Sequence, residues 1–116
     1  FENNYVHDNL RSKNGDVGVG VYFANAGTDN LIIRNNRIEN NAGHGIHFNG
    51  DSSVGGDGIQ SGHLIERNII SNNGENGMNM DGVQSFTLVD TLIANNGRHG
   101  VRGFQIDASE GPADSH

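Results

Sequence analysis

The chain has 116 residues, enough for one small domain, and apolar residues make up only 33% of it. The formal net charge of −7 at pH 7 argues against a nucleic-acid partner, which would require a basic surface. The sequence contains no apolar run long enough to span a membrane, and without cysteine it has no disulfide framework or thiolate metal site.

A repeated pattern opens the chain in a faint copy over residues 1–23. Its matching positions are Phe1, Asn4, Val6, Asp8 and Asn9 in the first half, and Gly20, Val21, Tyr22 and Phe23 in the second. Residues 10–17 have no counterpart in later copies and are predicted to bulge out as a loop. Residues 18–23 are predicted to resume a strand, and residues 24–30 to form a turn.

The clearest copy follows at residues 31–48 and ends in the letters I-R-N-N-R-I-E-N-N-A-G-H-G-I-H-F. Its apolar residues alternate with polar ones, as in Ile46 and Phe48 on either side of His47. Alternation of this kind predicts strands, because successive side chains of a strand point to opposite faces. The Asn-Asn and Gly positions between the alternating runs are typical of turns.

The pattern returns at residues 65–80 and again at residues 88–103. Between the second and third copies, residues 49–62 form a glycine-rich insertion that is predicted to be a loop on one face. Residues 104–107 are predicted to begin another strand, and residues 108–116 to form a polar tail or linker. We therefore assign residues 1–107 to the repeats, and expect the chain to be a piece of a longer protein.

Short strands, no helical periodicity and a repeat near 23 residues, the separation of Gly77 and Gly100, indicate an all-β solenoid. We predict a right-handed parallel β-helix of about four coils, in which each coil buries its apolar face against the next. Val6, Ile38, Ile70 and Ile93 are expected to stack inside it. Its open ends are unpaired sheet edges, so end-to-end self-association is expected.

The Asn pairs fall into columns when the copies are aligned. One column is Asn9, Asn41, Asn73 and Asn96, and another is Asn4, Asn36 and Asn68, continued by Thr91. A carboxamide both donates and accepts, so amides about 4.8 Å apart on stacked strands can form an internal ladder. The alternative is that Asn-Asn only marks exposed turns.

The same alignment places four polar residues in one outward file: Tyr22, His47, Asn79 and Arg102. Near it the alignment places His44, His99, Asp81 and Arg98, and these eight residues are the candidate site. A phenol, imidazoles, amides and guanidinium groups in one line are suited to hydrogen-bonding a sugar chain. The alternative is an ordinary solvated polar face.

The N-N-x-x-x-G-apolar-x-apolar units resemble those of the pectin-lyase-like superfamily of right-handed parallel β-helices, especially polysaccharide lyases and alginate C5-epimerases. The resemblance implies an extracellular or cell-surface protein that acts on a uronan by abstracting a proton next to the carboxyl group. His47 or Tyr22 would then act as base or acid, and Arg102 would pair with the carboxylate. The Asp-Pro-His motif of the epimerases is absent, since the only proline is Pro112. The alternative function is a non-catalytic scaffold, adhesin or glycan-binding module.

Metal binding is not predicted by any fixed spacing of ligands. His44, His47 and His99 lack a carboxylate partner at a defined separation, so no transition-metal site is assigned. Asp51 and Asp57 in the glycine-rich insertion carry carboxylate oxygens, which are the ligands that calcium prefers. Calcium is therefore the one cofactor that the sequence allows.

Overall fold

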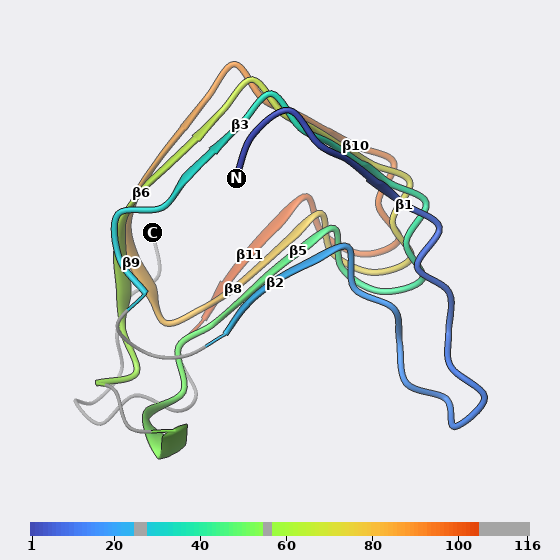
Figure 1. Ribbon diagram of the computed structural model, residues 1–116, viewed down its shortest axis with the longest axis horizontal. Coiled ribbons are helices and arrows are strands. Elements are labelled where there is room, and N and C mark those ends of the chain that lie inside the picture. The colour runs from blue at the N-terminus through green and yellow to red at the C-terminus, as the bar shows by residue number, and fades with distance from the viewer. Residues whose placement is uncertain (25–27, 55–56, 105–116) are drawn as a thin grey trace.

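The computed structural model describes residues 1–24, 28–54 and 57–104, which form a parallel β-helix of three sheets (Figure 1). The first sheet contains β1 (Tyr5–His7), β4 (Arg37–Glu39), β7 (Ile69–Ser71) and β10 (Leu92–Ala94). The second contains β2 (Val21–Ala24), β5 (Ile46–Asn49), β8 (Met78–Asp81) and β11 (Val101–Phe104). The third contains β3 (Ile32–Arg34), β6 (Gln60–Glu66) and β9 (Val83–Val89). Every strand pair is parallel, which confirms the prediction of an all-β parallel β-helix.

The core is a column of apolar side chains between the three sheets. In the first sheet, Val6 pairs with Ile38, Ile38 with Ile70, and Ile70 with Ile93, as the repeat alignment predicts. The middle residues of this stack, Ile38 and Ile70, are fully buried. Fully burying an isoleucine stabilises the fold by about 1.5–3 kcal/mol. The stabilisation from this stack therefore compensates for the low apolar content of the chain.

The two residues of each Asn-Asn pair have different structural roles. The first residue has left-handed backbone geometry, with φ of 56° at Asn40 and 56° at Asn72, and both side chains are exposed. Asparagine tolerates that geometry better than most residues. The second residue points inward and is buried, as at Asn41 and Asn73, each 1% exposed. Turn formation and internal hydrogen bonding therefore occupy neighbouring positions of one motif.

The second residues form the predicted amide ladder. The Nδ2 atom of Asn9 donates to Oδ1 of Asn41 at 2.8 Å, Asn41 donates to Asn73 at 2.9 Å, and Asn73 donates to Asn96 at 3.0 Å. The backbone N–H of each donor residue reaches the same acceptor oxygen. A second ladder runs through Asn4, Asn36 and Asn68 and ends on the Thr91 hydroxyl.

Two strand boundaries differ from the prediction. Strand β2 begins at Val21 rather than Gly18, although Gly18 still accepts a backbone hydrogen bond from Gly43. Strand β6 begins at Gln60, inside the predicted insertion at residues 49–62. The backbone N–H of Gln60 donates to Gly82, and its buried side chain donates to the Phe23 carbonyl. These hydrogen-bond partners are distant in sequence, so the local sequence does not reveal them. The glycine-rich composition of the segment therefore predicts a loop where the structure has a strand.

The two insertions lie where Figure 1 shows chain projecting from the coils. Residues 10–17 form a loop closed by backbone hydrogen bonds between Ser12, Gly15 and Asp16, and the other insertion contains the short 3₁₀ helix η1 (Ser52–Val54). Phe104 ends β11, while the rest of the predicted strand at 104–107 and the predicted tail at 108–116 lie outside the described residues. Among the described residues, no helix is long and apolar enough to cross a membrane.

Candidate functional site

The outward file of the second sheet has the register that the sequence predicts. Tyr22 pairs with His47, His47 with Asn79, and Asn79 with Arg102. Two residues further along the same strands, Asn49 pairs with Asp81. Since residues two apart on a strand share a face, these side chains belong to one outer surface.

Three rings cluster at the start of the file. The Tyr22 and His47 rings meet edge to face with centroids 5.0 Å apart, and those of His44 and His47 do so at 5.2 Å. The Nδ2 atom of Asn49 donates a hydrogen bond of 2.7 Å to the Tyr22 hydroxyl. This hydrogen bond fixes the orientation of the phenol, while Tyr22 as a whole remains 51% exposed.

His44 is held by a carboxylate that the sequence analysis did not assign to the site. The backbone N–H of Asn76 donates to Nδ1 of His44 at 3.1 Å, so the neutral ring carries its proton on Nε2. That Nε2 atom lies 3.1 Å from Oε2 of Glu75, to which it donates. Oε1 of Glu75 lies 3.8 Å from the Arg98 guanidinium. Glu75 directly precedes Asn76, which occupies the same position of the repeat as His44, and this adjacency is the sequence signal for its contact with His44.

Burial keeps the imidazoles of this cluster neutral. It lowers the pKa of His47 from 6.5 to about 4, with a smaller contribution from His44. Burial also lowers the pKa of His44, although the Glu75 charge opposes this. At neutral pH His47 is therefore an uncharged ring that can accept a proton or a hydrogen bond.

The same burial predicts destabilisation by mild acid. Because the pKa of His47 is lower in the folded state, the unfolded chain takes up the proton first, so stability falls as pH drops from 6.5 towards 4. We expect His47 alone to cost about 2 kcal/mol between pH 7 and pH 5 in urea unfolding. His44 and His63, whose pKa values burial also lowers, act in the same direction. His47→Asn should make the free energy of unfolding depend less steeply on pH. An unchanged pH dependence in this variant would refute the assignment of the acid destabilisation to His47.

The rest of the candidate site is divided between buried and exposed groups. Asn79 is 3% exposed and accepts a hydrogen bond of 2.8 Å from the Asn76 amide, and Asp81 is 4% exposed. These two side chains are therefore buried parts of the outer face rather than groups exposed on it. His99, Arg98 and Arg102 are exposed, and the Arg102 guanidinium lies over the Phe104 ring at 4.5 Å.

The insertion carboxylates form local turns. Oδ1 of Asp51 accepts the backbone N–H of Ser53 at 2.8 Å, and Oδ1 of Asp57 accepts that of Ile59 at 2.9 Å. Within the described part of the chain, no three histidine, cysteine or acidic side chains are grouped closely enough to hold a metal ion.

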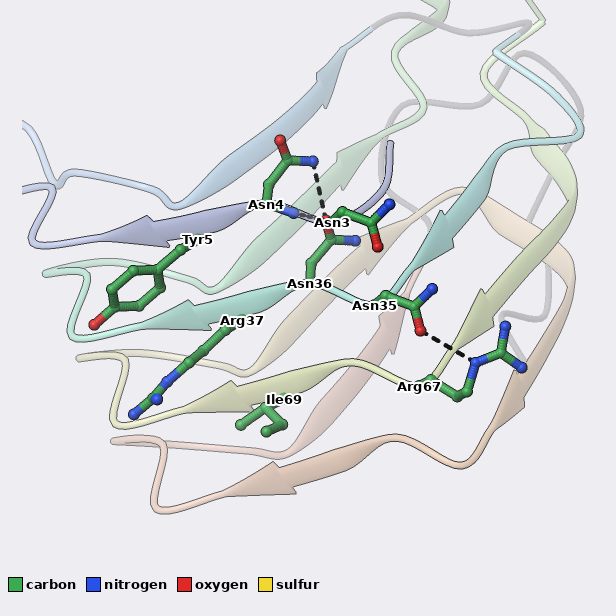
Figure 2. A pocket seen from close by; sticks show the side chains of 8 residues that line it. All are labelled: Asn3, Asn4, Tyr5, Asn35, Asn36, Arg37, Arg67 and Ile69. Atoms are coloured by element: carbon green, nitrogen blue, oxygen red, sulfur yellow. Dashed lines mark hydrogen bonds between the residues drawn. The ribbon is translucent and has the colours of Figure 1, made fainter.

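An open pocket of about 500 Å³ lies away from the outward file, beside the first sheet (Figure 2). It contains none of the candidate residues; its lining includes Asn3, Tyr5, Asn35, Arg37 and Arg67. Its guanidinium groups are paired, Arg37 with Glu39 at 2.9 Å and Arg67 with Glu66 at 3.0 Å. The Tyr5 hydroxyl also donates to Glu39, at 2.7 Å. With its charges balanced and amides on its wall, the pocket suits a neutral, hydroxyl-rich ligand better than an anion.

Comparison of the chain with protein-family models, with curated proteins and with solved structures found no match.

Proposed function

We propose that the outward face of the second sheet binds a polysaccharide, and that the chain is part of an extracellular or cell-surface protein. The supporting observation is the parallel register, which places Tyr22, His47 and Arg102 on one line across successive strands. Strands of a sheet lie about 4.8 Å apart, so the line presents polar groups at regular steps, as an extended sugar chain does. The exposed Tyr22 ring offers a stacking surface, and Arg98 and Arg102 offer charge.

The ligand best suited to this face is an acidic glycan. A guanidinium forms charge-assisted, often bidentate hydrogen bonds with a carboxylate, and no acidic side chain among the described residues pairs with Arg102. The Arg98 side chain is 63% exposed, and its guanidinium lies 3.8 Å from Glu75, beyond hydrogen-bonding distance. Both cations therefore remain available to a uronate.

Uronan lysis or C5-epimerisation is the catalytic form of this proposal. His47 is neutral at pH 7 and contacts Tyr22, so the pair supplies a base and an acid for proton abstraction. Arg102 lies two strand positions from His47, or about 10 Å, so it would hold the carboxylate of a neighbouring sugar. The reacting carboxylate would then require another cation, and for this reason binding is better supported than catalysis.

The test is a titration of the chain with oligogalacturonate and with a neutral glucan oligosaccharide, followed by amide chemical shifts. Arg102→Ala is expected to weaken oligogalacturonate about tenfold and the neutral ligand little, because one charge-assisted pair is lost. Lys13→Ala is the matched control, since it removes an equal charge from an exposed loop outside both the outward file and the pocket. Equal effects of the two substitutions, or shifts confined to another face, would refute the proposal.

The pocket in Figure 2 favours a second candidate, a non-catalytic glycan-binding module. Its balanced charges and amide lining favour neutral sugars, and Tyr5, 55% exposed, offers an aromatic surface. In the same titration this function requires the glucan to shift Tyr5 and Asn35 while His47 and Arg102 remain unaffected.

We further propose that copies of the chain associate through the ends of the β-helix. Apolar positions that are fully buried in the middle of the stack are exposed at its ends, as for Val101, 40% exposed, against Met78, 0%. Strand edges that pair with no described strand, beside such side chains, favour pairing with another chain.

A further inference from the structure

Several asparagines of the chain directly precede a glycine, the pair at which an asparagine amide is hydrolysed most readily. They are Asn14, Asn49, Asn73, Asn76 and Asn96. In this reaction the backbone nitrogen of the glycine attacks the side-chain Cγ atom, ammonia leaves, and a succinimide ring forms. Water then opens the ring at either carbonyl and gives aspartate or isoaspartate. The reaction requires a free asparagine side chain and a glycine N–H that releases its proton, and glycine crowds the ring least because it has no Cβ.

Four of these glycine N–H groups are held by the stacking of the coils. Each donates to a backbone carbonyl of a neighbouring coil: Gly50 to Asp81 at 2.9 Å, Gly74 to Asn41 at 2.8 Å, Gly77 to His99 at 2.8 Å and Gly97 to Asn73 at 2.8 Å. The bonds join segments distant in sequence, so the nitrogen is released only when neighbouring coils separate. Opening of that kind carries much of the free energy of unfolding.

The asparagine side chains of the same four pairs are also fixed. Each Nδ2 atom has an acceptor: the Tyr22 hydroxyl at 2.7 Å for Asn49, the Asn96 amide at 3.0 Å for Asn73, the Asn79 amide at 2.8 Å for Asn76 and the Ile70 carbonyl at 3.2 Å for Asn96. Asn73 and Asn76 are in addition buried, each 1% exposed. Rotation of these amides towards the glycine nitrogen would break the hydrogen bonds that hold them.

Asn14 has none of these constraints. It is exposed in the loop that projects between β1 and β2 (Figure 1), and its side chain forms no hydrogen bond with any described residue. The Gly15 N–H donates only within the loop, to the Ser12 carbonyl at 3.0 Å. All the hydrogen bonds described for residues 11–16 close within that segment. The loop can therefore open while the coils remain stacked.

We propose that Asn14 is a site of spontaneous deamidation in the folded chain, and that the β-helix protects the other four Asn-Gly pairs. The reaction consumes one water and releases one ammonia, so it requires no enzyme or cofactor. Arg11 and Lys13 against Asp16 leave the loop with one positive charge, which the new carboxylate cancels. The isoaspartate product also lengthens the backbone by one methylene. Deamidation therefore changes both the charge and the shape of this loop without touching the core.

The first experiment is peptide mapping by mass spectrometry after incubation of the folded chain in mildly alkaline buffer. Digestion in water enriched in the heavy oxygen isotope separates earlier conversion from conversion during handling. Asn14 is expected to convert at least about a hundredfold faster than the other four, because those require opening of the coils. In concentrated urea all five should convert at similar rates. Conversion of Asn73 as fast as that of Asn14 in the folded chain, or a difference that persists in urea, would overturn the proposal.

Asn14→Gln is the matched variant. It keeps an amide at the same place in the loop, but the longer side chain forms a cyclic imide much more slowly. The variant should keep the wild-type urea midpoint and should lack the acidic species that wild type accumulates on anion-exchange chromatography. An isoaspartyl methyltransferase supplied with S-adenosylmethionine should label the incubated wild type and not the variant. Equal amounts of acidic species or label in the two proteins would refute the assignment to Asn14.

Discussion

Gly77→Ala is expected to lower the free energy of unfolding by about 2–3 kcal/mol, whereas Gly100→Ala should change it by less than about 0.5 kcal/mol. Both glycines occupy the same column of the repeat. A Cβ at Gly77 would lie 2.6 Å from a backbone oxygen, 2.6 Å from Ile93 and 2.8 Å from the Asn96 amide. The backbone cannot move away without breaking the parallel pairing of β8 and β11.

The measurement is urea unfolding at a concentration low enough to keep the chain monomeric. Gly100→Ala serves as the internal control because it makes the same chemical change and meets nothing closer than 3.6 Å. A loss of equal size at both positions would show that glycine acts through backbone flexibility rather than close approach.

The repeat predicted the register of the sheets because a parallel β-helix reuses each position at every turn. Once Ile38, Ile70 and Ile93 were aligned, strand pairing and the inward direction of the column followed from alternation alone. The ladders followed for the same reason, since Asn41 and Asn73 occupy equivalent positions at the spacing of neighbouring strands.

The parts of the site that the sequence analysis missed depend on contacts between unlike positions. The Glu75 contact with His44 joins neighbouring columns, which an alignment of equivalent residues does not compare. Burial of Asn79 depends on what surrounds the outer face, whereas alternation predicts only that this side chain points outward. The pocket of Figure 2 likewise forms between unlike positions of the repeat. Turn residues such as Asn35 and Arg67 line it together with residues of the first sheet such as Tyr5 and Arg37.

Asn73→Leu is expected to cost about 3 kcal/mol or more in urea unfolding, because leucine fills the volume but cannot hydrogen-bond. Oδ1 of Asn73 accepts the backbone N–H of Asn41 at 3.2 Å and its Nδ2 at 2.9 Å, and Asn41 is only 1% exposed. Two buried donors would lose their partner, each at a cost of about 1–3 kcal/mol. The extra apolar contact does not offset this loss, since the site is lined by amides.

The neighbouring Asn72 is the matched control for the ladder. It is exposed and has a φ of 56°, so Asn72→Gly keeps the backbone geometry and removes an amide from outside the ladder. We expect that variant to remain within about 1 kcal/mol of wild type. If Asn73→Leu also remained there, the ladder would be a consequence of coil stacking rather than a cause of it. A large difference between these adjacent asparagines would instead assign the stabilisation to the inward residue of the Asn-Asn pair.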